Sequence, residues 1–97
     1  MRDEQIDLVL RALAHPERRR ILMLLKRGAG QSLFDICASS AVATGVPLAR
    51  QTISQHLDAL EQAGLVEVTW KGRVKAHSAN LEPLRAALAS AIKPLVG

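Results

Sequence analysis

The chain has 97 residues, of which 48% are hydrophobic and 23% charged, so length and composition predict one globular domain over residues 1–97. A single cysteine excludes an intramolecular disulfide, and the lack of a long apolar run or signal segment predicts a cytoplasmic protein without a membrane partner. Thirteen Lys and Arg against nine Asp and Glu give a net charge of +4, which favours a polyanionic partner.

The first third of the chain is predicted to form two helices. Residues 4–14 repeat apolar side chains at helical spacing. A second helix is expected to begin at Pro16, because proline suits the first helical position, and to end at Gly28 or Gly30. Its arginines at 18–20 are expected to face water or a partner.

A third helix is predicted to begin after Ser32, because Ser32 and Asp35 have the spacing of a capping box. The Ser- and Ala-rich stretch 38–46 predicts a fraying helix end and then a turn. Residues 38–48 either extend this helix or form a loop beside a small-molecule pocket, and the plain extension is favoured. A fourth helix follows, with its apolar residues on one face, and Gly64 ends it.

The spacing of apolar residues changes after Gly64. Residues 66–70 and 73–77 alternate on either side of a turn at Lys71-Gly72, which predicts a β-hairpin. Asn80 is expected to cap a last helix whose length Pro94 limits. The predicted fold is therefore mainly α with a β-hairpin wing, a winged helix-turn-helix with four helices, a hairpin and a final helix.

The fourth helix is a candidate for reading DNA bases. Its N-terminal half carries polar and basic side chains and no acid before Asp58. Arg can bind guanine bidentately and Gln can bind adenine, and recognition helices place such residues in the major groove. The residues expected to read sequence are Arg50, Gln51, Thr52 and Gln55. The alternative is an ordinary polar face exposed to solvent.

The hairpin is a candidate for contacting phosphates. Lys71, Arg73 and Lys75 cluster at its tip and returning strand, with no acid among them. Such cations position a protein on a duplex without reading sequence. The alternative is a charged edge strand that resists aggregation.

Two segments together resemble one family of regulators. Residues 12–22, ALAHPERRRIL, are similar to the second-helix signature of ArsR-type winged-helix transcriptional repressors. Residues 51–66, QTISQHLDALEQAGLV, resemble that family's recognition helix and the entry to its wing, and KGRVKAHS at 71–78 is similar to the wing of members without metal sites. The resemblance implies a helix-turn-helix over residues 32–63 and a wing over 66–78.

The resemblance also implies a homodimeric DNA-binding regulator. Two copies related by a two-fold axis are expected to meet an inverted-repeat operator, and the protein is expected to repress by competing with RNA polymerase. Ser54 and His56 match the Ser-x-His positions of the family's recognition helix, so Ser54 is expected to contact DNA. His56 either binds a phosphate or supports the fold. The first and last helices are expected to form the dimer interface through Ile6, Val9, Leu10, Leu13, Leu84, Leu88, Ile92 and Leu95. Alternatively, these residues pack only within one subunit.

No metal site or cofactor is expected. The family's third-helix metal site uses a Cys-x-Cys pair, of which only Cys37 is present, and its last-helix site uses acidic and His ligands, whereas residues 80–97 hold Glu82 and no His. Cys37 is interpreted as a small buried hydrophobic residue, with a redox-sensing thiol as the alternative.

The sequence contains no motif that is typical of an enzyme, so no enzymatic activity is predicted. The alternatives to a sequence-specific regulator are a winged-helix module for protein contacts and a nonspecific architectural DNA binder. A small-molecule or protein effector is possible in principle, and the sequence names none.

Overall fold

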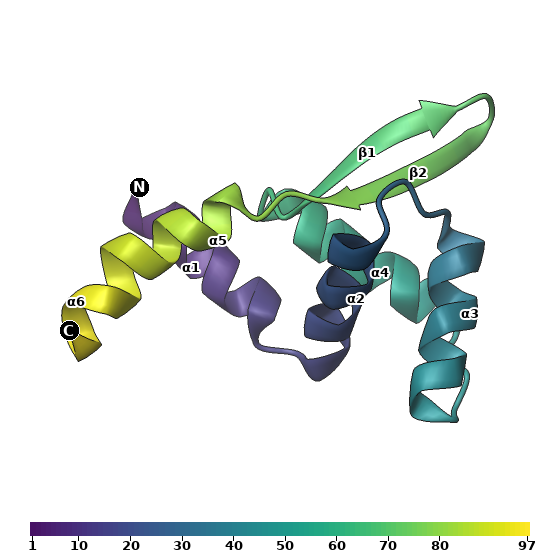
Figure 1. Cartoon of the computed structure of the whole chain (residues 1–97), viewed down its shortest axis with the longest axis horizontal. Coiled ribbons are helices and arrows are strands. Elements are labelled where there is room, and N and C mark those ends of the chain that lie inside the picture. Colours follow the sequence, from purple (N-terminus) through teal and green to yellow (C-terminus); the bar gives the residue numbers. More distant parts are fainter.

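The computed structural model describes residues 1–97 and confirms a mainly helical winged helix-turn-helix (Figure 1). The elements are α1 (Asp3–Leu13), α2 (Pro16–Arg27), α3 (Leu33–Thr44), α4 (Arg50–Gln62), β1 (Val66–Lys71), β2 (Val74–Ala79), α5 (Glu82–Ala87), a π-helical turn (Leu88–Ile92) and α6 (Lys93–Val96). Helices α1, α5 and α6 lie together at one end, α3 lies at the other, and the hairpin extends from the middle of the molecule toward the α3 end (Figure 1). None of the helices combines the length and the hydrophobicity that a transmembrane span requires.

The start of α3 follows from local chemistry. The Ser32 side chain accepts a hydrogen bond from the Asp35 amide, and the Asp35 carboxylate accepts one from the Ser32 amide, both at 3.1 Å. This capping box satisfies two amides that the helix leaves free. The Ser32 backbone amide, and then its hydroxyl, hold the pKa of the Asp35 carboxyl below its ordinary value.

The long segment after Cys37 extends α3 as a regular helix. The favoured extension is therefore confirmed, and the expected fraying from residue 38 is wrong. The Thr44 hydroxyl lies 2.9 Å from the Ser40 carbonyl oxygen and 2.8 Å from that of Val46, which stabilises the last turn. The helix ends at Gly45, whose φ of 72° is a left-handed conformation that glycine adopts without steric cost.

The hairpin pairs six residues of each strand, from Val66 opposite Ala79 to Lys71 opposite Val74. The turn consists of Gly72 and Arg73, one residue later than predicted, with Gly72 at a φ of 63°. Gln31 forms a short bridge with His77, because each residue's amide donates to the other's carbonyl oxygen at 3.0 and 2.7 Å. This bridge joins the base of the hairpin to the connection between α2 and α3.

The last helix begins one residue later than predicted. Leu81 is its N-cap residue, and the Asn80 side-chain oxygen accepts a hydrogen bond from the Glu82 amide at 3.2 Å. Pro94 lacks the amide that an α-helix would use, and the hydrogen-bond pattern changes to a π-helical turn just before it. The chain then stays helical to Val96.

The core lies where α1, α2, α3 and α4 meet the base of the hairpin. Its buried side chains include Ile21, Leu25, Ile36, Ile53, Leu60 and Leu65, and Val9 of α1 and Ala87 of α5 complete it. Burial of these apolar groups holds α4 in place, so the core sets the orientation of the candidate recognition helix.

We predict that Ile36→Ala lowers the free energy of unfolding by about 2–5 kcal/mol, because Ile36 is 0% exposed and its loss leaves a cavity. Val42→Ala on the same helix is the matched control. Val42 is 86% exposed, so this change should stay within about 0.5 kcal/mol. Urea unfolding followed by circular dichroism measures both, and equal effects would contradict the assigned face of α3.

Candidate nucleic-acid interface

Helix α4 has one buried face and one exposed face. Ile53, Leu57 and Leu60 are buried in the core. On the other side Arg50, Gln51 and Gln55 are exposed, and Thr52 and Ser54 are half-buried. The structure therefore leaves the predicted base-reading side chains accessible at the start of the helix, where a major groove would be met.

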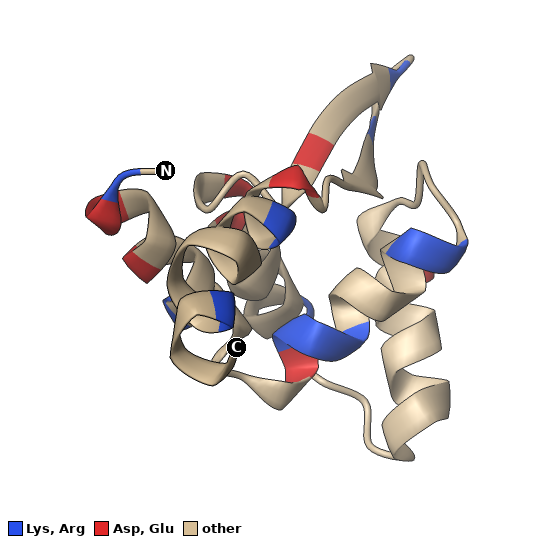
Figure 2. Ribbon diagram, turned by 60° about the vertical axis from the view of Figure 1, so that its left-hand side comes forward, with Lys and Arg blue, Asp and Glu red and all other residues tan.

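The hairpin places cations next to this helix. Lys71, Arg73 and Lys75 are all exposed. Figure 2 shows basic residues toward the tip of the hairpin and an acidic one nearer its base. Arg50, Arg73 and Lys75 line one cleft of about 500 Å³ between α3, α4 and the hairpin. Asp58 of α4 lines the same cleft and Lys71 lies outside it, so residues from separate elements form one surface with more cations than carboxylates.

Two aromatic residues also line this cleft, and the sequence analysis did not predict that they would lie there. Phe34 is 73% exposed and Trp70 is 65% exposed. No sequence pattern distinguishes Phe34, because it lies among the apolar residues that open α3 and only the packing shows which of them faces outward. Trp70 alternates with Thr69 and Lys71 in a strand whose outer half is exposed on both faces.

His56 contacts α2 as well as belonging to the recognition helix. Its Nδ1 lies 3.1 Å from the Arg18 Nε, which donates, and its ring centroid lies 5.9 Å from that of His15. Partial burial, followed by the positive charge of Arg18 and by His15, lowers the pKa of His56, and Glu17 opposes this in part. This contact supports the structural role for His56. Arg18 was expected to face water or a partner, whereas in the structure it is half-buried against α4.

The predicted dimer residues divide into two layers. Ile6 and Val9 are buried within the subunit, so they support the surface from beneath. The more accessible residues are Leu13, Leu84 and Ile92, which are half-buried, and Leu10, Leu88 and Leu95, which are exposed. Leu8 and Val96 add further exposed apolar side chains on α1 and α6. Exposed apolar side chains therefore occur on α1 and on the C-terminal segment, the two parts of the chain that the sequence predicts for the dimer interface.

No three or more His, Cys, Asp or Glu residues gather where they could hold a metal ion. Cys37 is half-buried and packs against the core.

The sequence of this chain is similar to those of known helix-turn-helix proteins. Residues 13–69 match a family described as a helix-turn-helix domain. An uncharacterized HTH-type transcriptional regulator of Bacillus subtilis, YuzN, is 33% identical over 79 residues, which cover 81% of this chain and 86% of that protein. The HTH-type transcriptional regulator CmtR of Mycobacterium bovis is 37% identical over 73 residues, or 75% of this chain. The match spans only 56% of the length of CmtR.

Solved structures agree with this class. An ArsR-like transcriptional regulator from Rhodococcus sp. RHA1 has a TM-score of 0.73 and 31% identity, with 96% of this chain and 81% of that chain covered. A homodimeric winged helix-turn-helix DNA-binding domain from Mycobacterium bovis has a TM-score of 0.68 and 30% identity, with 89% and 74% covered. The fold is that of winged helix-turn-helix transcriptional regulators. Within that class, the chain belongs to the ArsR-type family.

We predict that acid weakens the fold through His56. Because the pKa of His56 is lowered in the folded state, His56 takes up a proton at a higher pH in the unfolded chain than in the folded one. The contribution of neutral His56 to the free energy of unfolding is therefore complete above about pH 6.5 and is lost as the pH falls below that value. His56→Asn removes the titrating group and keeps an acceptor for Arg18. Urea unfolding between about pH 8 and about pH 5 should show a steeper loss of stability in the parent than in the variant. Parallel curves would contradict the assignment.

Proposed function

We propose that this protein is a homodimeric, sequence-specific DNA-binding regulator that represses transcription at an inverted-repeat operator. The observation that supports this most is the basic surface formed by the start of α4 and the hairpin, in which Arg50, Arg73 and Lys75 line one cleft. The face has the charge that a phosphate backbone requires and the donors that base edges accept.

The proposed roles divide between the two elements. Lys71 and Arg73 bind phosphates and set the register of the protein on the duplex. Arg50, Gln51, Thr52 and Gln55 contact base edges in the major groove, and Ser54 contacts DNA beside them. An operator occupied in this way excludes RNA polymerase, which is the simplest route to repression.

The proposed dimer uses the exposed layer of α1 and the C-terminal helices. Leu10, Leu88 and Leu95 would be removed from water in a two-fold arrangement. The related Mycobacterium bovis domain is described as homodimeric, which supports this arrangement. Two recognition helices related by a two-fold axis would meet half-sites about one helical turn apart.

Selection of bound fragments from a genomic DNA library tests the proposal. We expect an enriched inverted repeat with half-sites about one turn apart. Gln51→Ala should then relax the preference at one base pair, at a cost of about 1–3 kcal/mol, because it removes a base contact. Lys71→Ala should weaken all sequences alike and reduce the salt dependence, because it removes a phosphate contact.

The outcomes separate the alternatives. Enrichment without a motif would indicate an architectural DNA binder, and no retention would favour a module for protein contacts. Indistinguishable effects of the two variants across operator sequences would overturn the division of roles.

We predict that Leu88→Asp raises the dimer dissociation constant about a hundredfold or more, because the dimer would have to bury an unpaired carboxylate. Val46→Asp, in the exposed connection after α3, is the control and should leave the dissociation constant unchanged. Sedimentation equilibrium measures both, and circular dichroism checks folding. A dimer unaffected by Leu88→Asp would place the interface elsewhere.

A further inference from the structure

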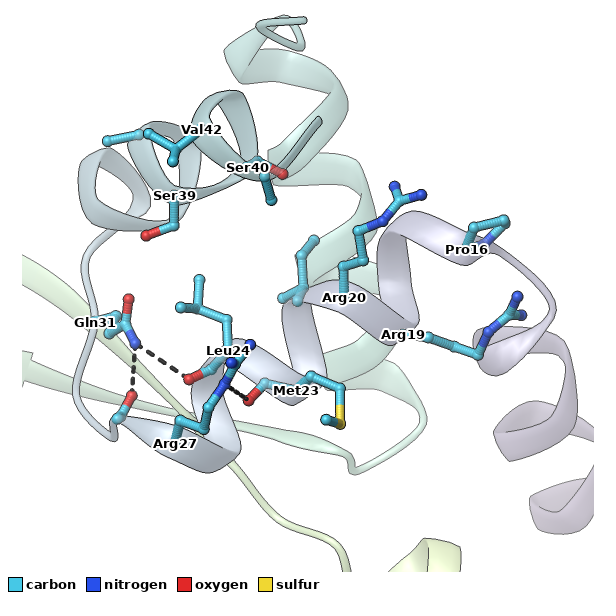
Figure 3. A pocket seen from close by; sticks show the side chains of 14 residues that line it. Pro16, Arg19, Arg20, Met23, Leu24, Arg27, Gln31, Ser39, Ser40 and Val42 are labelled. Atoms are coloured by element: carbon cyan, nitrogen blue, oxygen red, sulfur yellow. Dashed lines mark hydrogen bonds between the residues drawn. The ribbon is translucent and has the colours of Figure 1, made fainter. Parts of the chain in front are cut away.

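A groove of about 1050 Å³ lies between α2 and α3, separate from the cleft between α3, α4 and the hairpin (Figure 3). Ligand sites in proteins are typically hollows of about 300–1,000 Å³ lined mostly by apolar groups with a few polar ones. The groove therefore has the size of a site for a small organic molecule.

Apolar side chains from both helices form part of the lining of the groove. Leu24 and Met23 contribute from α2, and Ala38, Val42 and Ala43 contribute from α3. Met23 is 54% exposed and Val42 is among the most exposed side chains of the molecule. After Asp35, α3 carries no charged residue at all, so its outward face is apolar without covering by any other element. Such a face is stabilised when an apolar group covers it.

The charged groups that border the groove are all positive. Three of its fourteen lining residues are arginines, and none is acidic. Arg20 is paired with Glu17, whereas Arg27 forms no ion pair. The Arg27 Nε donates to the Met23 carbonyl oxygen at 3.3 Å, which leaves its two terminal nitrogens for a ligand. Ser39 points from α3 into the end of the groove where Gln31 lies (Figure 3).

We propose that this groove binds an amphipathic organic carboxylate, with the carboxylate at Arg27 and Ser39 and the apolar body along Leu24, Met23 and Val42. A guanidinium suits a carboxylate because it can donate two parallel hydrogen bonds. The Gln31 side-chain nitrogen already donates to the Leu24 and Gly28 carbonyl oxygens, at 3.4 and 2.8 Å, and holds the end of α2 that bears Arg27.

The groove is connected to the recognition helix through α2. The Glu17 carboxylate accepts a hydrogen bond from the Ser40 hydroxyl at 3.0 Å, which ties α2 to α3. The next residue, Arg18, donates to His56 on α4. A ligand wedged between α2 and α3 would therefore change the angle at which α3 and α4 are held. This regulatory step rests on the proposed DNA-binding function, whereas the binding site itself does not.

Decanoate is the probe, titrated as monomer into the ¹⁵N-labelled 97-residue chain and followed by amide NMR shifts. We expect the shifts to concentrate on α2 and α3 around Arg27 and Val42. The uncharged 1-decanol should bind about tenfold or more weakly, since it lacks the charge that Arg27 recognises. Shifts confined to the apolar surface of α1 and α6, or equal affinity for decanol, would overturn the proposal.

Matched variants test the two ends of the site. Arg27→Gln replaces the guanidinium with a shorter, uncharged polar group, and it should weaken decanoate binding about tenfold or more. Val42→Asp should do the same through charge repulsion at an exposed position that the fold does not require. Lys26→Gln removes a neighbouring exposed charge outside the groove and should have no effect. Equal effects of Arg27→Gln and Lys26→Gln would show a nonspecific attraction of charge and overturn the site.

The regulatory step is tested separately with the selected operator DNA. Decanoate should weaken operator binding by the parent about tenfold and leave Arg27→Gln unaffected, and operator DNA should weaken decanoate binding by the same factor, as linkage requires. Decanoate bound in the groove without any change in DNA affinity would overturn the regulatory step and leave the site standing. Failure to find any operator would overturn the proposed function, and the NMR titration would still decide the site.

Discussion

The burial of one face of α4 is the constraint on which the rest of the structure depends. Ile53, Leu57 and Leu60 recur at helical spacing and are removed from water among residues of α2 and α3. A helix that buries one face must expose the opposite one. The same packing that stabilises the core therefore presents the polar N-terminal residues of α4 to solvent, so fold and interface are consequences of a single arrangement.

The hairpin is placed by backbone hydrogen bonds rather than by its charged side chains. His77 is buried and pairs with Gln31, and the Asn80 amide donates to the Leu65 carbonyl oxygen at 2.8 Å. These bonds hold the base of the hairpin against the helices and leave its tip free in solvent. Lys71, Arg73 and Lys75 can thus all be exposed near the tip, because these backbone bonds do not involve their side chains.

Helix α2 connects the parts of the molecule that the proposals treat separately. Its first turn contacts α3 through Glu17 and α4 through Arg18, and its last turn borders the groove through Arg27. A rigid helix transmits displacement along its length, because close-packed neighbours cannot move independently. The arginines of α2 therefore have different surroundings and different proposed roles, although they are identical side chains a few residues apart.

The sequence by itself determined the elements, their order and the polar character of α4, because periodicity, Pro16, the Ser32–Asp35 capping box and Gly72 act within a few residues of the chain. The hairpin turn and the N-cap of the last helix were each predicted one residue too early, because neighbouring residues at both places are equally suited to a turn or a cap. Only the tertiary structure decided that Arg18 holds His56, that Phe34 faces outward and that a groove lies beside α3. Those facts depend on the angles at which helices pack, and these angles are set by contacts between residues far apart in the sequence, which local patterns do not encode.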